Sequence, residues 1–96
     1  MKTIIIYRQA GTFAENKDVA REYRLKQILP ALDKGEEKVV LDFKNVTGAT
    51  QSFVHALISD VIRKYGNDVF NRLYFKNCTP AVKQVVNIVA DYMEES

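Results

Sequence analysis

Apolar and polar residues follow one another along the chain in blocks that switch between strand-like and helix-like spacing. The clearest strand-like block covers residues 38–43 and contains the nearly continuous apolar run Val-Val-Leu-Asp-Phe. Runs rich in β-branched and aromatic residues predict further strands over residues 2–8 and 72–76, and a short extended piece over residues 12–14. We therefore expect strands to be separated by longer segments with a different periodicity.

Apolar residues spaced three and four positions apart predict helices in the segments between these strands. The first helix covers about residues 16–32, and Pro30 is expected to kink or shorten its last turn. The second covers about residues 51–65 and stops at Gly66. The third carries its apolar residues over positions 82–93.

Strands that alternate with helices of this length favour parallel pairing and right-handed crossovers. The sequence therefore predicts a single α/β domain over residues 1–96, with a small mixed, largely parallel sheet of about four strands and three helices. An antiparallel hairpin of the first two strands is an alternative. Thr79 and Pro80 suit the N-cap and first position of the last helix, and residues 94–96 are expected to fray.

Composition and charge limit the partners and bound groups that we expect for this chain. The chain has 96 residues and a formal charge of +2 from 14 basic and 12 acidic residues, which are interspersed and form no basic stripe. Nucleic acid is therefore not an expected partner. Cys78 and His55 are the only residues of their types, so neither a disulfide framework nor a Cys/His zinc site is expected, and no cofactor. No apolar run approaches the roughly 20 residues of a membrane span, so we expect a cytoplasmic protein.

The segment that follows the central strand is the best candidate for a functional site. A strand end, a short loop and a helix start come together there, and free backbone N–H groups with the positive end of the helix dipole face outward. The side chains expected to meet a protein partner are Asp42, Asn45, Gly48, Thr50, Gln51, Ser52 and His55.

Each of these residues also has a purely structural interpretation. Ser52 can serve as the helix N-cap or as a first-turn hydroxyl, and Thr50 is the alternative N-cap. Asp42 can brace its own loop by accepting backbone hydrogen bonds. Cys78, just before a helix start, is either a thiol of lowered pKa or a buried, unreactive one.

The order of these elements resembles the STAS domains, a family named for sulfate transporters and anti-sigma factor antagonists. The resemblance is nearest to a group of small, uncharacterised STAS-like bacterial proteins. It rests on a glycine turn at 11–13, the strand Val-Val-Leu-Asp-Phe-Lys-Asn-Val at 39–46, Thr-Gln-Ser at 50–52, and Asn-Cys-Thr-Pro-Ala-Val at 77–82.

The resemblance implies a regulatory role without catalysis. The family's phosphorylatable serine falls on Ser52, while the other positions of its Asp-Ser-Ser-Gly signature hold Thr50, Gln51 and Phe53. An anti-sigma-like kinase or ATPase is the partner that the resemblance implies, and phosphorylation of Ser52 is the implied switch. A phosphate of about −1.5 to −2 charges would block a docked partner and leave the fold intact.

Two other hypotheses remain open from the residues themselves. Ser52 and His55 lie three positions apart on one helix face, so a small enzyme that uses them as nucleophile and base is one alternative. The other is a homodimeric assembly protein, which would associate through an exposed edge strand or through the second helix.

Overall fold

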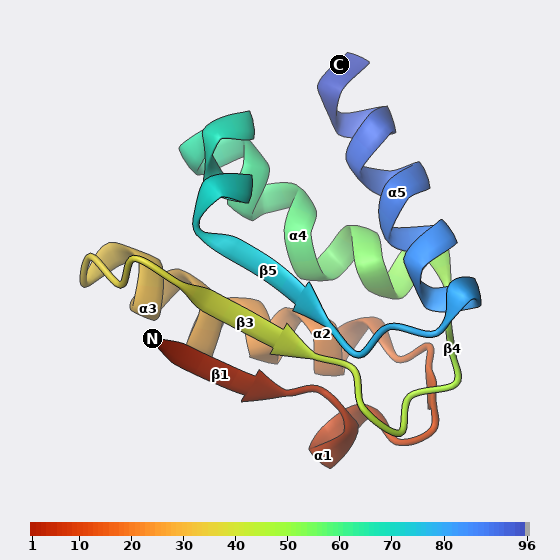
Figure 1. Cartoon of the computed structure of the whole chain (residues 1–96). Helices are drawn as coiled ribbons and strands as arrows, with labels where there is room; N and C mark the ends of the chain where they lie inside the picture. Colours follow the sequence, from red (N-terminus) through yellow and green to blue (C-terminus); the bar gives the residue numbers. More distant parts are fainter. Residues whose placement is uncertain (96) are drawn as a thin grey trace.

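The β-branched and apolar runs of the sequence form short parallel strands, which make up one layer of the molecule (Figure 1). The structure is a computed structural model that describes residues 1–95, with Glu95 described by its backbone alone. The larger sheet has three strands in the order β1-β3-β5, namely β1 (Lys2–Ile5), β3 (Val39–Asp42) and β5 (Leu73–Lys76). A separate parallel pair consists of β2 (Phe13–Ala14) and β4 (Gly48–Ala49).

The predicted α/β class and the parallel pairing are confirmed, with corrections to the first strands. The hairpin alternative is wrong, because β1 pairs with β3 in parallel. The chain leaves the sheet after Ile5 and forms the short helix α1 (Tyr7–Ala10), so the predicted strand over 2–8 is too long. Gly11, with a φ of 74°, turns the chain into β2. Within the described residues β2 pairs only with β4, so the predicted four-stranded sheet is divided into two parts.

The helical segments lie close to their predicted positions. In chain order they are α2 (Lys17–Tyr23), the π-helical η1 (Arg24–Ile28), α3 (Leu29–Asp33), α4 (Gln51–Tyr65), the 3₁₀-helical η2 (Asn67–Asn71) and α5 (Pro80–Glu95). Gly66 follows α4 with a φ of 77°, as its predicted role at the helix end requires. Residues 94 and 95, for which fraying was predicted, belong to the last turn of α5, and Ser96 lies outside the described residues.

Pro30 changes the predicted first helix in an unexpected way. The helical path continues from α2 through η1 into α3, and the π-helical turn ends with a bond from the Leu29 N–H to the Arg24 carbonyl. A proline has no N–H with which to continue the normal ladder, and the wider turn comes immediately before it. In a regular α-helix Leu25 would share the apolar face of Ile28 and Leu32, as the spacing in the sequence predicts. The π-helical turn changes that spacing, and the Leu25 side chain is 50% exposed.

The helices pack against one face of the three-stranded sheet. In Figure 1, α2 and α3 pass behind the strands, and no helix crosses the near face of the sheet. Strand residues that point toward the helices, such as Ile4, Leu41 and Leu73, belong to the buried core. Thr3 and Tyr74, which point to the near face, are exposed. The carboxyl ends of all three strands reach the same edge, where the loops toward α1, β4 and α5 begin.

Candidate functional site

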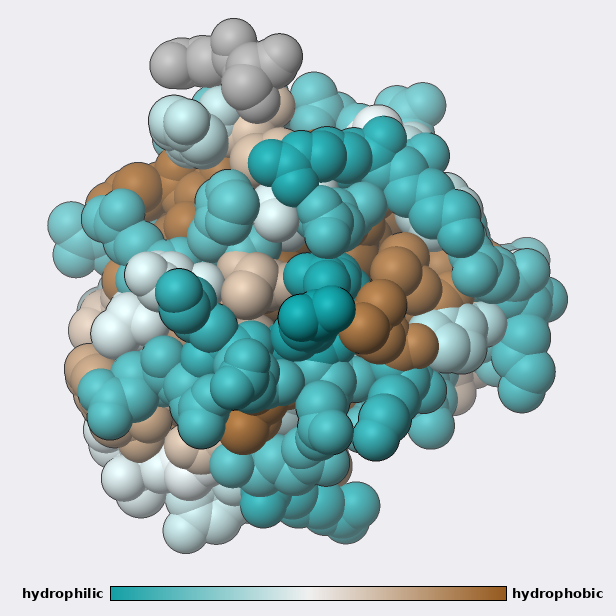
Figure 2. Space-filling model, turned by 180° about the vertical axis from the view of Figure 1, so that it is seen from behind, coloured by the Kyte–Doolittle hydropathy of each residue, from teal (hydrophilic) through white to brown (hydrophobic). Residues whose placement is uncertain are grey.

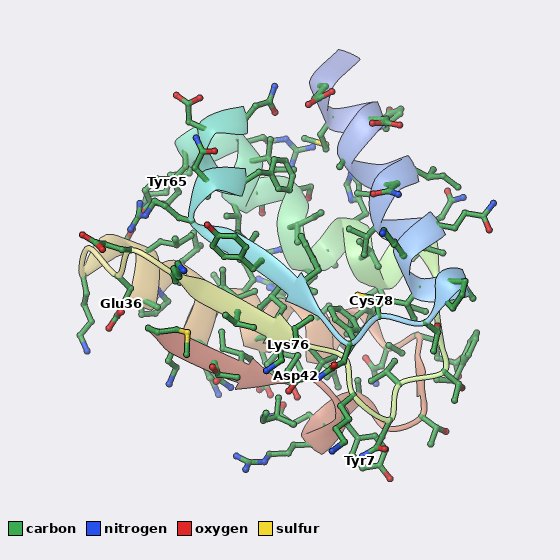
Figure 3. All side chains as sticks on the ribbon, viewed as in Figure 1. Tyr7, Glu36, Asp42, Tyr65, Lys76 and Cys78 are labelled. Atoms are coloured by element: carbon green, nitrogen blue, oxygen red, sulfur yellow. The ribbon has the colours of Figure 1, made fainter. Side chains whose placement is uncertain are left out.

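Asp42 organises the loops at the carboxyl edge of the sheet. Its Oδ1 accepts a hydrogen bond of 2.9 Å from the Lys44 backbone N–H and another of 2.9 Å from the Asn77 side-chain amide. Figure 3 shows Asp42 beside Lys76 at the tips of the strands, with Cys78 in the loop beyond. The Asn77 hydrogen bond, followed by the Lys44 N–H and the two neighbouring lysine charges, lowers the pKa of Asp42. The predicted loop-bracing role is confirmed.

The lowered pKa of Asp42 makes part of the protein's stability dependent on pH. Because the folded-state pKa lies below the ordinary carboxyl value of about 4, this contribution is present above that pH and is lost as the pH falls through the folded pKa. We expect Asp42→Asn to lower the free energy of unfolding near pH 7 and to flatten its decline in acid. Urea denaturation at a series of pH values measures both effects.

Asn77→Ala provides an independent check of this pH dependence. It removes the strongest contact of the Asp42 carboxylate and keeps the carboxylate itself, so the folded-state pKa of Asp42 rises toward the unfolded value. The acid-induced loss of stability should therefore be smaller than in the wild type and should be complete at a higher pH. Identical acid profiles in wild type and both variants would contradict the bracing role.

Threonine hydroxyls join the loops that carry β4 and α5. The Thr47 hydroxyl donates to the Thr12 carbonyl at 3.0 Å, and the Thr79 hydroxyl donates to the Thr47 carbonyl at 3.1 Å. The Thr79 oxygen also accepts from the Val82 N–H at 3.2 Å, which caps α5 as predicted, and Pro80 occupies the first helical position. The beginnings of α4 and α5 are therefore tied to the same loop region.

Asn45 and Gly48 shape this region and lie outside the groove described below. Asn45 has a φ of 71°, a left-handed conformation that asparagine tolerates in a turn. Gly48 is buried opposite Phe13, and a Cβ atom there would lie 2.8 Å from the Phe13 ring. The absence of a side chain at Gly48 thus lets the Phe13 ring lie close to the β2–β4 pair, where a Cβ atom would displace it.

The first turn of α4 separates the roles of Thr50 and Ser52. Thr50 is the N-cap, with its hydroxyl oxygen accepting from the Phe53 N–H at 3.1 Å. Gln51 and Ser52 are therefore the first two helical residues, and both are exposed. Within the described part of the chain no hydrogen bond engages the Ser52 hydroxyl. Of the two structural interpretations of Ser52, the N-cap is wrong and the first-turn position is confirmed.

Ser52 opens onto a groove between α4 and α5. The groove has a volume of about 470 Å³. It is lined by three predicted site residues, Gln51, Ser52 and His55. Five residues that the sequence did not single out also line it: Lys17, Ala56, Ile88, Val89 and Tyr92. Asp42, Asn45, Gly48 and Thr50 are not among the lining residues. The predicted site is therefore divided: four of its residues lie outside this groove, and three line its wall. We call it the α4–α5 groove.

Ile88 and Tyr92 are the functional candidates that the sequence reasoning missed. They lie four positions apart on α5, beside the buried stripe that includes Val82, Val86 and Val89. Ile88 is 42% exposed and Tyr92 is 63% exposed, so they form an apolar ridge along the groove. Figure 2 shows separate hydrophobic patches on an otherwise hydrophilic face, one of them at the side where α5 lies. An apolar pair beside the core stripe was the signal that could have identified them.

Ser52 and His55 face the groove without the contacts of a catalytic pair. Ser52 and His55 both line it, as their helical spacing predicts, and His55 is partly exposed. No hydrogen bond joins their side chains in the described residues, and no carboxylate lines the groove to orient the histidine. A nucleophile and base pair requires such contacts. The groove instead presents apolar side chains flanked by a lysine and an amide.

Cys78 and the acidic residues are the remaining candidates for a reactive or metal-binding site. Burial raises the pKa of the half-buried Cys78 thiol, against the alternative of a lowered pKa. Among residues 1–95, no cluster of three or more His, Cys, Asp or Glu side chains could hold a metal ion. None of the helices described is long and apolar enough to cross a bilayer.

A comparison with protein-family models places this geometry in context. Residues 25–83 match the model described as a STAS-like domain of unknown function (DUF4325). The match includes the central strand, the Thr-Gln-Ser start of α4 and the Thr-Pro start of α5, whereas the glycine turn at 11–13 lies outside it. No curated protein and no solved structure matches the chain.

Proposed function

Because the chain belongs to the family of STAS-like domains, we propose that it is a non-enzymatic regulatory module that binds a partner protein through the α4–α5 groove. The observation that carries the proposal is the position of Ser52. Its hydroxyl is exposed at the rim of the groove, and Thr50 already caps the helix, so the serine is not required for helix formation. The resemblance to the STAS domains also implies that the family's phosphorylatable serine falls on Ser52.

The walls of the groove supply the means of binding. Tyr92 and Ile88 present apolar surface, and exposed aromatic residues of this kind often provide much of the binding energy at protein interfaces. Lys17 and His55 add polar groups at the rim. A partner that buries Tyr92 would bring its own surface against Ser52. An anti-sigma-like kinase or ATPase is the partner class that the family resemblance favours.

Phosphorylation of Ser52 would act on such an interface and would leave the fold nearly unchanged. An anion at a helix N-terminus is stabilised by roughly 0.3–1 kcal/mol, too little to alter the folded state. The same doubly charged group buried against a partner would lose its hydration and meet apolar surface, at a cost of several kcal/mol. The switch would therefore release the bound partner.

We expect Ser52→Glu to weaken partner binding by about tenfold or more, which corresponds to about 1.4 kcal/mol, with little change in melting temperature. Ser52→Ala should retain the partner because it introduces no charge. The measurement is a parallel pull-down from native cytosol with wild type and both variants. Mass spectrometry identifies the captured proteins and any phosphate on Ser52.

Gln9→Glu is the matched control, since it adds one negative charge at an exposed position of α1. It should retain the same partner as the wild type. If Ser52→Glu and the wild type capture the same proteins in equal amounts, and Ser52 carries no phosphate, the proposed switch is wrong. Loss of binding in Gln9→Glu as well would show a general charge effect and would equally contradict a specific role for Ser52.

A further inference from the structure

Three polar side chains that have no described partner line the α4–α5 groove. Ser52 and His55 lie one helical turn apart on α4, and Lys17 lines the groove from the first position of α2. Among residues 1–95, no ion pair or hydrogen bond engages the side chain of any of the three. Their donors are therefore free to bind an acceptor that is added to this groove.

The charge of the groove favours an anion. Of its described lining residues, Lys17 is the one Lys or Arg, and none is Asp or Glu. Asp18 and Asp91 are next to lining residues in the sequence but do not line the groove themselves. Consecutive residues of a helix do not face the same side. An anion in this groove therefore has an ammonium group on the lining and no carboxylate.

A phosphate on the Ser52 oxygen has enough acceptors to use both neighbours. It carries about −1.5 to −2 charges near pH 7 and three strong acceptor oxygens. The Lys17 ammonium offers three N–H donors on a flexible stem, and His55 offers a ring N–H from the next turn of the same helix. One phosphate can therefore accept from Lys17 and from His55 within the groove.

We propose that a phosphate on Ser52 is held inside the α4–α5 groove by Lys17 and His55, so that the modified chain occupies its own partner-binding surface. The inference rests on the proposed function, because it names how modification of Ser52 closes that groove. The phosphoryl group comes from a nucleoside triphosphate bound to a kinase. The bond between its terminal phosphorus and the bridging oxygen breaks as the Ser52 oxygen bonds that phosphorus. The nucleoside diphosphate leaves, and the hydroxyl proton passes to a base of the kinase.

The test uses the full chain with phosphoserine incorporated at position 52 during translation, in the absence of any partner. A 31P NMR titration measures the second ionisation of the phosphate, whose ordinary pKa is about 6. We expect its ionisation constant to be about threefold larger or more than in the phosphopeptide of residues 50–53, which lacks Lys17 and His55. Methyl signals of Ile88 should also shift on phosphorylation, because Ile88 lines the same groove.

Lys17→Gln in the phosphorylated chain should lower this ionisation constant by about twofold or more, and His55→Gln should lower it as well. Lys17 is exposed, so its substitution leaves the core intact. Lys34→Gln is the matched control, because it removes an exposed lysine beyond the other end of the same helical path and should change nothing. The field of the α4 N-terminus acts in every variant, so the difference between the two lysine variants reports Lys17 alone.

Equal ionisation constants in the phosphorylated wild type and in Lys17→Gln would overturn the proposal. Ile88 methyl signals that do not move on phosphorylation would overturn it too, because the phosphate would then point into solvent. Neither result involves a partner protein, so the pull-down with Ser52→Glu tests the proposed function separately. A pull-down that captures no partner, together with the ionisation expected here, would contradict the proposed function and support the binding of the phosphate by Lys17 and His55.

Discussion

Replacing Phe53 with alanine will lower the free energy of unfolding by about 3–5 kcal/mol. Phe53 follows Ser52 directly and is fully buried, at 0% exposure. It stands where the STAS signature has a glycine, so its ring fills core volume that the signature sequence leaves to other residues. Removal of the ring leaves a cavity as well as lost apolar burial. Urea denaturation followed by circular dichroism measures the change.

Phe13→Ala is the matched control for this result. The Phe13 ring is 51% exposed and packs over Gly48, so its removal should cost clearly less than the removal of Phe53. Equal losses in the two variants would contradict a core role for Phe53. A small loss at Phe53 would instead indicate that the core does not depend on this ring and that the position could hold the glycine of the STAS signature.

Tyr23→Phe will lower the free energy of unfolding by about 1–3 kcal/mol, the second largest effect that we expect. The Tyr23 side chain is 2% exposed, and its hydroxyl lies 2.8 Å from the carbonyl oxygens of both Ile5 and Ile6. It also accepts from the Gln9 N–H at 3.1 Å. Without the hydroxyl, these backbone groups at the junction of β1 and α1 lose their buried partner. Thermal and urea denaturation near pH 7 measure the loss.

The same hydroxyl makes the free energy of unfolding depend on pH in the alkaline range. Burial raises the pKa of Tyr23 above the ordinary tyrosine value of about 10. Its contribution to stability is therefore complete below that pH and is lost as the pH rises toward the folded-state pKa. Tyr23→Phe should reduce the alkaline decline in stability. Tyr65→Phe is the control at neutral pH, because the Tyr65 hydroxyl bonds Asp33 nearer the surface and should cost less to remove.

Local sequence signals were sufficient to predict the helices whose first or last residues are a hydroxyl cap, a proline or a glycine. α4 begins after Thr50 and ends before Gly66 because a hydroxyl cap and a glycine of positive φ are local features. α5 begins at Pro80 after the Thr79 hydroxyl for the same reason. The apolar run of β3 likewise predicted a central, buried strand, since only a strand covered by its neighbours can be apolar on both faces.

The first third of the chain shows where such signals failed. The β-branched run at the N-terminus continues the strand pattern to Arg8, yet Tyr23 binds the carbonyls of Ile5 and Ile6 and the chain turns there into α1. Leu25 fits an apolar helix face in the sequence, but the π-helical turn before Pro30 changes that spacing, and the side chain is exposed. Both outcomes depend on contacts between segments far apart in sequence or on a change of helical register.

The candidate site shows the same division. Ser52 and His55 could be placed on one helix face from their spacing alone, and both line the α4–α5 groove. Their neighbours across the groove, Ile88 and Tyr92, come from a helix more than thirty residues further along the chain. Asp42 was predicted to brace a loop, but its partner Asn77 could be identified only once β3 and β5 were side by side.

The sequence by itself determined the α/β class, the central strand and the start of the helix that carries Ser52, because apolar periodicity and capping residues act within a few positions. Only the tertiary structure decided which surfaces those elements form. The packing of α5 beside α4 creates the groove at Ser52, and the pairing of β3 with β5 brings Asn77 to Asp42. Both features are formed by segments that meet only after folding, so no local pattern specifies them.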